Sequence, residues 1–386
     1  MLKKLFISSV FIFFIFGGII QAQDSIPIGV IIDQSGKTAD VGKWMCQGVE
    51  DYFTYVNEQG GVRGKKINLL VRDNHYDVLT SIQQYGELKE KGVLAIIGWG
   101  TAESLALVRY VNADNITWLP GSMTETLVQP VKPYNFILTA SYEDQFYALL
   151  GYAIKHPKVI GRPVKVAFIF NSTPFGKAPI KKGVEMVGKL GLEFVGSEIV
   201  ELDEPNADKQ IEGLILKNPD YIIIQETGPA TLAVLNSCKK FGLKSTVMGT
   251  FYSGNETIIT KAEDALKEVE LITASPLARG YEDLPGMSRI KQFCVTRYPE
   301  MQEWPQTYIE GWIMAMLYTE VLNRCRDNLT RENFRNMFES IKDFNPEGLM
   351  PTISYSLTNH KGTNKVKIYK ANIKTKRFDA LSEWTD

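Results

Sequence analysis

The sequence is poor in the residues that build metal sites and disulfide frameworks. Its 386 residues include only three histidines, far apart at His75, His156 and His360, and four cysteines without a CxxC pair. Zinc sites are built from clusters of Cys and His at short spacing, so we expect neither a metal nor a cofactor. A chain of this size does not need disulfides. Spacing alone leaves open whether Cys294 and Cys325, which fall in neighbouring helical segments, form one.

Charge of one sign and catalytic motifs are lacking as well. The 43 Lys and Arg residues nearly balance the 44 Asp and Glu residues, which leaves a formal net charge of −1. Binding to nucleic acid or to an anionic membrane surface generally needs an excess of basic residues, so we expect neither partner. The sequence contains no GxSxG, HExxH or GxGxxG motif and no complete phosphate-binding loop. We therefore expect that the chain is not an enzyme.

One strongly apolar stretch does occur, at the N-terminus. Two lysines precede an almost unbroken apolar run, Leu5–Phe16, and Ala22 is a small residue suited to cleavage before Gln23. The run is shorter than the roughly 20 residues that span a bilayer, and the layout is typical of a secretory signal peptide. We expect residues 1–22 to be removed and the mature chain to reside in the periplasm. No cysteine lies near the cleavage point, so no lipid anchor is expected.

From Ile26 onward, short apolar runs alternate with amphipathic stretches. In the latter, apolar residues such as Met45, Val49 and Val56 recur at helical spacing. Continuous apolar strands separated by helices are typical of a parallel sheet that is covered on both faces. The first block is predicted to contain strands at Ile28–Ile32, Ile67–Val71, Val93–Ile97 and Ile116–Leu119, and helices at Gly42–Gln59, Val78–Lys91 and Ala102–Ala113.

The pattern then restarts, which predicts a second block of the same kind. No linker rich in Pro, Gly or Ser separates the blocks, so we expect short hinge strands near Thr139, Ala274 and Met350. The predicted fold is α/β, with two doubly wound lobes and parallel central sheets: residues 26–139 plus 274–349, and residues 140–273 plus 350–386. The second block and the end of the chain are predicted to contain strands at Val164–Phe170, Glu193–Val200, Tyr221–Ile224, Thr246–Met248 and Val366–Ala371, and helices at Pro174–Leu190, Ala207–Lys217, Ala230–Phe241, Met287–Tyr298, Tyr308–Cys325 and Arg331–Ile341.

Several short segments at the junctions of these elements occur in a characteristic order. They are Ile28–Gly42, the turn Asn57–Ile67 with its Gly60-Gly61 pair and Gly64, Ala95–Thr101, Trp118–Ser122, Pro133–Phe136 and Ser172–Gly176. In this order and spacing they resemble the Leu/Ile/Val-binding family of periplasmic solute-binding proteins, over nearly the whole mature chain. The resemblance implies a monomeric receptor of the type I periplasmic binding fold, which closes its lobes on a small-molecule ligand and delivers it to the membrane permease of an ABC importer.

The first lobe contributes two candidate segments. Trp99, Gly100 and Thr101 follow a predicted strand and begin a helix, where ligands bind in doubly wound sheets. Backbone N–H groups and the helix dipole at such a position suit a carboxylate, and the alternative is that the glycines only permit tight strand–helix packing. In the family a Ser near this helix start holds the ligand carboxylate. Ala102 stands at that position, so the side-chain hydrogen bond would have to come from Thr101 or elsewhere.

Further candidates follow two other strands. Ser122 and Thr124 match the family's second carboxylate-binding segment, or they cap the turn that begins at Glu125. Phe175 matches an aromatic residue that covers the ligand in the family, or it is a packing residue. Each of these positions therefore carries a binding role and a structural role that the sequence alone does not separate.

The opposite lobe departs from the family where the ligand's amino group would bind. Phe251 and Tyr252 replace a segment whose Glu pairs with that group, and an aromatic ring supplies only a weaker cation–π attraction. We therefore expect a carboxylate without a standard α-amino group, for instance an aromatic acid. Glu226 and Thr227, at the end of another strand, are candidates for a ligand cation or hydroxyl, or they form a solvated rim. If Glu226 has taken over the missing role, an amino acid fits as well.

A ligand-sensing receptor that signals through a separate membrane partner is the alternative to transport. The same fold serves both functions, because a fold does not determine its output. Genes for permease subunits or for a sensor kinase next to this gene would separate the two.

Overall fold

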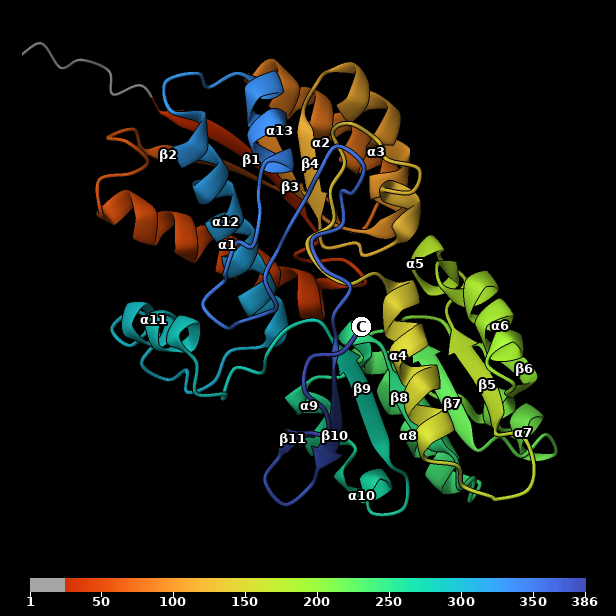
Figure 1. The fold of residues 1–386 in the computed structure, drawn as a ribbon. Helices are drawn as coiled ribbons and strands as arrows, with labels where there is room; N and C mark the ends of the chain where they lie inside the picture. Colours follow the sequence, from red (N-terminus) through yellow and green to blue (C-terminus); the bar gives the residue numbers. More distant parts are fainter. Residues whose placement is uncertain (1–24) are drawn as a thin grey trace, which may run out of the picture.

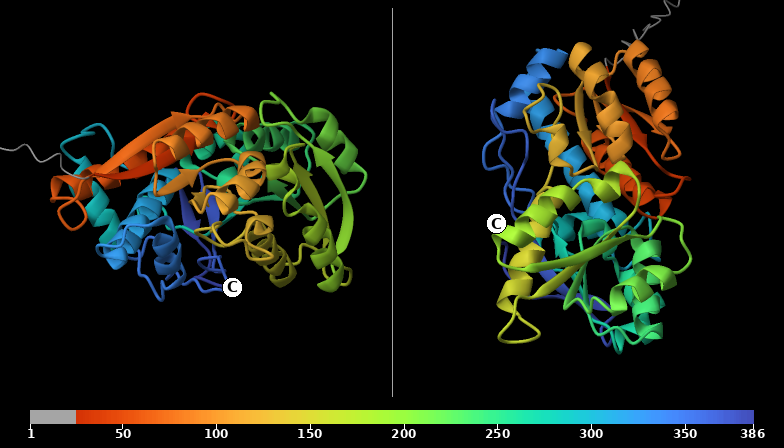
Figure 2. Two further views of the ribbon diagram at one scale, coloured as in Figure 1. Left: turned by 90° about the horizontal axis from the view of Figure 1, so that it is seen from above. Right: turned by 90° about the vertical axis from the view of Figure 1, so that its right-hand side faces the viewer.

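The computed structural model describes residues 25–386, which form two lobes (Figure 1). The two further views in Figure 2 show the same lobes from above and from the side. The expected signal peptide lies outside the described residues. Within residues 25–386, no helix combines the length and the apolar character that would be needed to traverse a bilayer.

The first lobe is built on a four-stranded parallel sheet in the order β2-β1-β3-β4. Along β1, Ile28, Val30 and Ile32 face the cluster that contains α1 and α12, whereas Ile31 packs against α2 and α3 on the other face. This alternation covers both faces of the sheet with helices, as the sequence pattern predicts. The elements are β1 (Ile26–Ile32), α1 (Ala39–Glu58), β2 (Ile67–Asp73), α2 (Val78–Glu90), β3 (Ala95–Gly98), α3 (Thr101–Ala113), β4 (Thr117–Pro120), η1 (Glu125–Leu127), α11 (Pro285–Cys294), α12 (Gln306–Cys325) and α13 (Arg331–Glu339).

The second lobe contains a seven-stranded sheet in the order β11-β10-β9-β8-β7-β5-β6. Strands β5 to β9 run parallel, and β10 and β11 add an antiparallel edge. One core packs α4 and α6 against this sheet, and another packs α7, α8 and α9. The elements are α4 (Tyr142–Lys155), β5 (Lys165–Phe170), α5 (Pro174–Lys177), α6 (Ile180–Lys189), β6 (Glu193–Ile199), α7 (Asp208–Ile215), β7 (Tyr221–Gln225), α8 (Gly228–Lys240), β8 (Thr246–Gly249), η2 (Phe251–Ser253), α9 (Glu256–Lys261), α10 (Glu263–Leu266), β9 (Leu271–Ser275), β10 (Lys367–Asn372) and β11 (Arg377–Ala380).

The structure differs from the predicted elements in a few places. The long helix expected from Pro174 to Leu190 is divided into α5 and α6, with Pro179 at the break. Proline lacks the N–H that would continue the first helix but is well placed just ahead of the next one. Strand β9 lies at the hinge expected near Ala274, whereas helices α4, α9 and α10 and strand β11 were not predicted.

The third crossing between the lobes lies further along the chain than expected. Leu349 accepts a backbone hydrogen bond from Ala278, and Tyr355 donates to the carbonyl of Ile137 at 3.1 Å. Residues 349–362 therefore pack on the first lobe, although a boundary near Met350 was expected. Val366 belongs to the core of the second lobe, so the chain crosses between residues 362 and 366.

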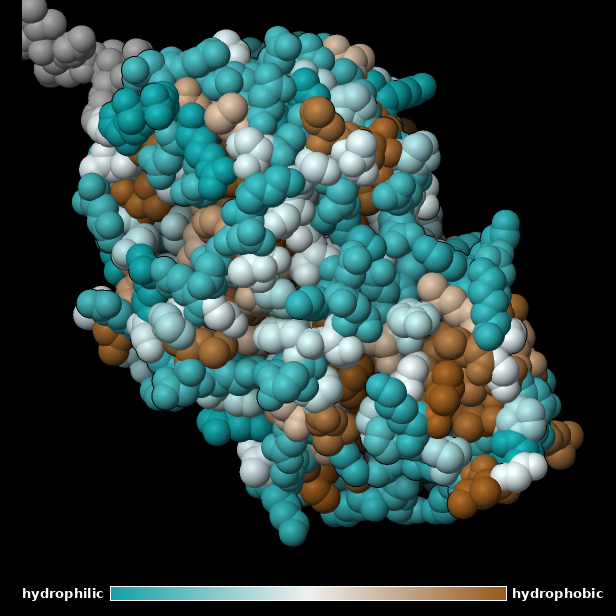
Figure 3. Space-filling model, viewed as in Figure 1, coloured by the Kyte–Doolittle hydropathy of each residue, from teal (hydrophilic) through white to brown (hydrophobic). Residues whose placement is uncertain are grey.

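Helix α12 lies at the centre of the first lobe. It is apolar on nearly all sides and buried along most of its length, which is typical of a core helix. All four cysteines of the chain are buried and free, so Cys294 and Cys325 are not joined. The surface seen in Figure 3 is mainly hydrophilic, with apolar side chains gathered over the second lobe near α4 and α6.

Candidate functional site

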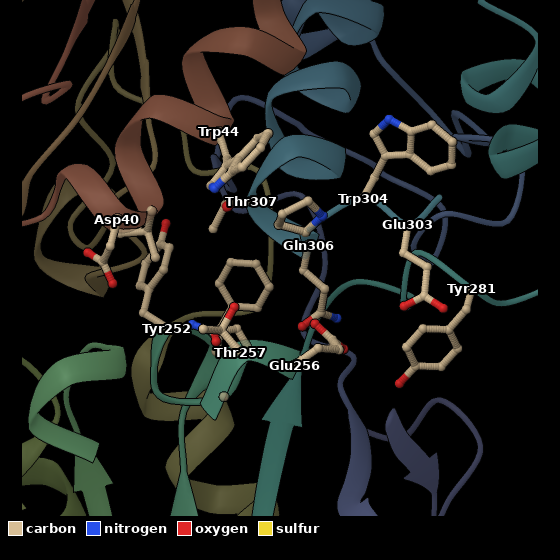
Figure 4. Close-up of a pocket in the computed structure, with 15 residues that line it drawn as sticks. Asp40, Trp44, Tyr252, Glu256, Thr257, Tyr281, Glu303, Trp304, Gln306 and Thr307 are labelled. Atoms are coloured by element: carbon tan, nitrogen blue, oxygen red, sulfur yellow. The ribbon is translucent and has the colours of Figure 1, made fainter. Parts of the chain in front are cut away.

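Two adjoining cavities lie between the lobes. The inner cavity is small, with a volume of about 20 Å³, and is lined by Thr38, Val41, Tyr76, Trp99, Gly100, Thr101, Gly121, Ser122, Tyr142, Phe175, Thr227 and Tyr252. The outer cavity has a volume of about 220 Å³ and is drawn in Figure 4. Val41 and Tyr252 line both cavities and form the wall between them.

The inner cavity lies at the carboxyl ends of strands from both sheets. Trp99 and Gly121 follow β3 and β4 of the first lobe, and Phe175, Thr227 and Tyr252 follow β5, β7 and β8 of the second. The ends of parallel strands, where loops lead into helices, are the usual ligand-binding edge of doubly wound sheets. The fold therefore brings the two binding edges face to face.

A short hydrogen-bond chain fixes Trp99 in the wall of the first lobe. Its indole Nε1 donates to Oγ1 of Thr38 at 2.8 Å, and this hydroxyl donates to Asp33 at 2.7 Å. Gly121 accommodates the ring, because a Cβ atom there would lie 2.7 Å from the indole. The result is a rigid aromatic surface at the end of β3.

Three further rings complete an aromatic wall. The centroid of Tyr252 lies 5.5 Å from that of Trp99 and 6.0 Å from that of Phe175, and Phe175 lies 5.4 Å from Tyr142. All three contacts have the edge-to-face geometry that aromatic rings prefer. Beside the rings, the hydroxyls of Thr101 and Ser122 lie 2.7 Å apart. The inner cavity is thus mainly apolar, with a few hydroxyl groups.

Tyr252 also joins the two lobes directly. Its hydroxyl donates to the carbonyl of Gly121 at 2.5 Å and lies 3.2 Å from both carboxyl oxygens of Glu310 on α12. A phenol has only one proton to donate. Burial raises the pKa of Glu310 well above its ordinary value. These contacts link η2 of the second lobe to two elements of the first.

Glu226 is buried in the second lobe beside the cavity and does not line it. One carboxyl oxygen accepts from the side-chain amide of Asn171 at 3.0 Å, and the other has no partner among the described residues. Burial raises the pKa of Glu226 well above its ordinary value. The next residue, Thr227, does line the inner cavity, and its hydroxyl also has no partner among residues 25–386.

The outer cavity is lined by acids and aromatic rings. Asp40, Glu256 and Glu303 line it. Two of these acids are paired with bases behind the lining, since Arg279 Nη1 lies 3.1 Å from Glu256 Oε1 and Arg377 Nε donates to Glu303 Oε1 at 3.0 Å. Gln306 extends from the start of α12 toward Glu256 (Figure 4), and its Nε2 donates to the carbonyl of Leu277 at 2.8 Å. The rings of Trp44, Phe251, Tyr252, Tyr281 and Trp304 complete the lining.

The structure brings most of the candidate residues from the sequence together. Trp99, Gly100, Thr101, Ser122, Phe175, Thr227 and Tyr252 line the inner cavity, and Phe251 joins Tyr252 in the outer one. Ala102, Thr124 and Glu226 line neither cavity. Thr124 precedes η1 without a side-chain capping bond.

Other lining residues were missed. Tyr76 follows β2 in a left-handed backbone conformation, with φ of 55°. Tyr142 belongs to α4, whose start is marked by the capping box of Ser141 and Asp144. The capping box is visible in the sequence, and it would have predicted the start of α4 and with it the position of Tyr142.

Comparisons with known proteins give a consistent result. A family model described as "Periplasmic binding protein" matches residues 25–377. The Leu/Ile/Val-binding protein homolog 1 of Brucella abortus (strain 2308) is 26% identical over 204 residues, and the match spans 52% of each chain, about half of that relative's length.

Two solved structures share the fold closely. A branched chain amino acid ABC transporter from Thermus thermophilus with bound valine has a TM-score of 0.86 and 24% identity, over 94% of this chain and 97% of its own. A fatty acid ABC transporter substrate-binding protein from Thermomonospora curvata has a TM-score of 0.84 and 21% identity, over 94% of this chain and 92% of its own. At these identities, the likeness establishes the fold and leaves the ligand open.

Proposed function

Because the chain belongs to the family of periplasmic binding proteins, we propose that it is an extracytoplasmic receptor which captures a small solute between its lobes and delivers it to the permease of an ABC importer. The resemblance indicated by the turn motifs is confirmed, and so is the α/β fold with two lobes and largely parallel sheets. The periplasmic location and the permease partner follow from the family and belong to the proposal.

The observation that carries this proposal is the inner cavity, because both lobes line it. A solute there would touch Trp99 and Gly100 on one side and Phe175 and Thr227 on the other. Ligand contacts on both lobes favour the closed state by their differential affinity, whereas contacts on one lobe would not. A closed shape that depends on the solute is what a permease would need to recognise a loaded receptor.

The lining favours a solute with an apolar body. Edge-to-face rings and Val41 enclose most of the inner cavity, and apolar surface removed from water contributes roughly 25 cal/mol per Å². An aliphatic or aromatic group suits the chemistry of such walls. The same fold holds valine in one solved structure and belongs to a fatty acid transporter's substrate-binding protein in another. An apolar body therefore does not determine which polar group the solute carries.

Binding and closure can be tested together. The mature chain would be equilibrated with a library of amino acids, amines, amides and organic acids, and native mass spectrometry would identify what is retained. We expect one solute per chain and a smaller radius of gyration by small-angle X-ray scattering when it binds. Retention of no solute, or binding without compaction, would contradict the proposal. Interaction of the loaded protein with a sensor kinase and not with a permease would favour the signalling alternative.

A further inference from the structure

The two cavities differ greatly in size. The inner cavity, at about 20 Å³, has room for about one water molecule, whereas the outer cavity has a volume of about 220 Å³. Only Val41 and Tyr252 line both of them. A solute larger than a water molecule can therefore contact both lobes at the inner cavity only if one of its walls moves aside.

Most of the aromatic wall of the inner cavity is fixed by its neighbours. The indole of Trp99 donates to Thr38 at 2.8 Å and lies against Gly121. Phe175 and Tyr142 are buried and contact each other edge to face. These three rings line the inner cavity and not the outer one. Because protein interiors are close-packed, a buried ring shifts only if the side chains behind it shift as well.

Tyr252 is in a different position, because the outer cavity lies on the far side of its ring. The ring can move toward that cavity without displacing packed side chains. Its hydroxyl is restrained by the carbonyl of Gly121 and by the carboxyl group of Glu310. Tyr252 is therefore the wall that yields when a solute enters, and its movement joins the two cavities into one compartment.

The lining of the outer cavity suits an apolar group. Trp44 and Tyr252 lie on one side of it, and Tyr281 and Trp304 lie on the other (Figure 4). Aromatic rings offer large apolar surfaces, and a ring in the solute gains edge-to-face or offset contacts with them. A phenyl ring or an aliphatic chain that enters this cavity is removed from water against such surfaces.

The charges around the outer cavity are already compensated. Glu256 lies 3.1 Å from Nη1 of Arg279, and Glu303 accepts from Nε of Arg377 at 3.0 Å. Asp40, the third lining acid, is exposed, so solvent screens its charge. A charged group of a solute would lose hydration here without gaining an unpaired partner. The part of the solute that enters this cavity is therefore uncharged.

We infer that the outer cavity takes the apolar, uncharged end of an elongated solute, and that Tyr252 is the movable wall through which this end enters. The inference rests on the proposed receptor function and adds the compartment that sets the length of the solute. The other end of the solute contacts Trp99 and Thr101 at the inner cavity. Tyr252 is thus a specificity-determining residue, because its position decides whether the second compartment is open.

Pairs of solutes that differ only in their apolar end test the inference. Titration calorimetry would compare valine with homophenylalanine, 3-methylbutanoate with 4-phenylbutanoate, and 3-methylbutanamide with 4-phenylbutanamide. We expect the phenyl member of at least one pair to bind about 10-fold more tightly than its isopropyl partner. Equal or weaker binding of the phenyl member in every pair that binds would overturn the inference and leave the receptor function intact. If none of the six solutes binds, the inference is wrong, and the receptor function is then decided by retention and compaction with the solute library.

A substitution that narrows the outer cavity tests the compartment itself. Thr257 on α9 is exposed and lines this cavity, so Thr257→Trp reduces its volume without disturbing the core. Binding of the phenyl member should weaken about 10- to 100-fold, and binding of the isopropyl member should change little. The matched control Thr260→Trp changes an exposed residue of the same helix that lines neither cavity, and it should bind both like the wild type. Equal effects of Thr257→Trp on both members, or no effect on either, would overturn the inference.

The role of Tyr252 has its own test. Tyr252→Ala removes the movable wall, so the ratio of phenyl to isopropyl affinity should rise although the bond to Gly121 is lost. A crystal structure with the phenyl member should show its ring beside Trp44 and Tyr281, with Tyr252 moved away from Gly121. An unchanged or lower affinity ratio, or a bound phenyl ring outside the outer cavity, would overturn the assignment.

Discussion

Replacing Glu103 with Gln should stabilise the ligand-free protein, and the gain should depend on pH. The pKa of Glu103 is raised from 4.5 to about 7 by burial and by neighbouring acids. An acid with a raised pKa in the folded state stabilises the fold below its unfolded pKa, and this contribution is lost as the pH rises through about 7. The shift corresponds to about 3 kcal/mol of unfolding free energy at pH 8. The side chain is buried, so solvent screening leaves most of this difference in place.

Urea denaturation of both proteins, followed by circular dichroism between pH 5 and pH 8, measures this effect. Glu103→Gln should differ little from the wild type at pH 5 and should be more stable by about 3 kcal/mol at pH 8. Glu143, whose pKa burial also raises to about 7, should leave some pH dependence in both proteins. Parallel curves for the two proteins, or a gain of the same size in the exposed-acid control Glu212→Gln, would refute the reasoning. A gain at pH 8 would mean that the chain keeps a destabilising acid next to its cavity, as binding sites often do.

Three further substitutions address closure of the cleft. Tyr252→Phe removes the donor to Gly121 and leaves buried Glu310 without its partner. The closed state should therefore lose about 1–3 kcal/mol, and calorimetry should show correspondingly weaker solute binding. Tyr147→Phe, which changes an exposed ring on α4, is the control. Because burial raises the pKa of Glu310, closure should weaken as the pH rises through the closed-state pKa, and Glu310→Gln should remove this dependence in small-angle scattering from pH 6 to pH 9. Gly121→Ala places a methyl group 2.7 Å from the ring of Trp99 and should lower stability by about 1–3 kcal/mol in thermal melts, and an unchanged melting temperature would contradict this packing.

The sheets and the place of the cleft could be predicted because both depend on local patterns. Runs such as Ile28–Ile32 alternate with amphipathic helices, and that rhythm specifies parallel sheets with helices on both faces. The rule that ligands bind at the carboxyl ends of such strands pointed to Trp99 and Phe175, which lie together in the inner cavity.

The missed parts depend on contacts between distant segments or on side-chain conformation. Glu103 is adjacent to the predicted Ala102, but its place beside the cavity requires its side chain to fold back over Gly100, which has φ of 80°. Gln306 does not follow a strand, so the rule for strand ends could not find it. It reaches the outer cavity because α12 begins beside the crossing between the lobes. The third crossing was placed too early, since residues 349–362 look like a connection and are held to the first lobe by hydrogen bonds to Ile137 and Ala278.

The contact that closes the lobes also limits the size of the solute. Tyr252 reaches Gly121 only across the inner cavity, and its ring separates that cavity from the outer one. A solute that fits within the inner cavity leaves this hydrogen bond in place and binds to fully closed lobes. A longer solute must move the ring, which joins the two cavities and leaves Glu310 without its partner. Because losing a buried hydrogen bond costs about 1–3 kcal/mol, each longer homologue has to gain more than that from the outer cavity before it can compete. We therefore expect the cleft to discriminate between solutes by length through Tyr252.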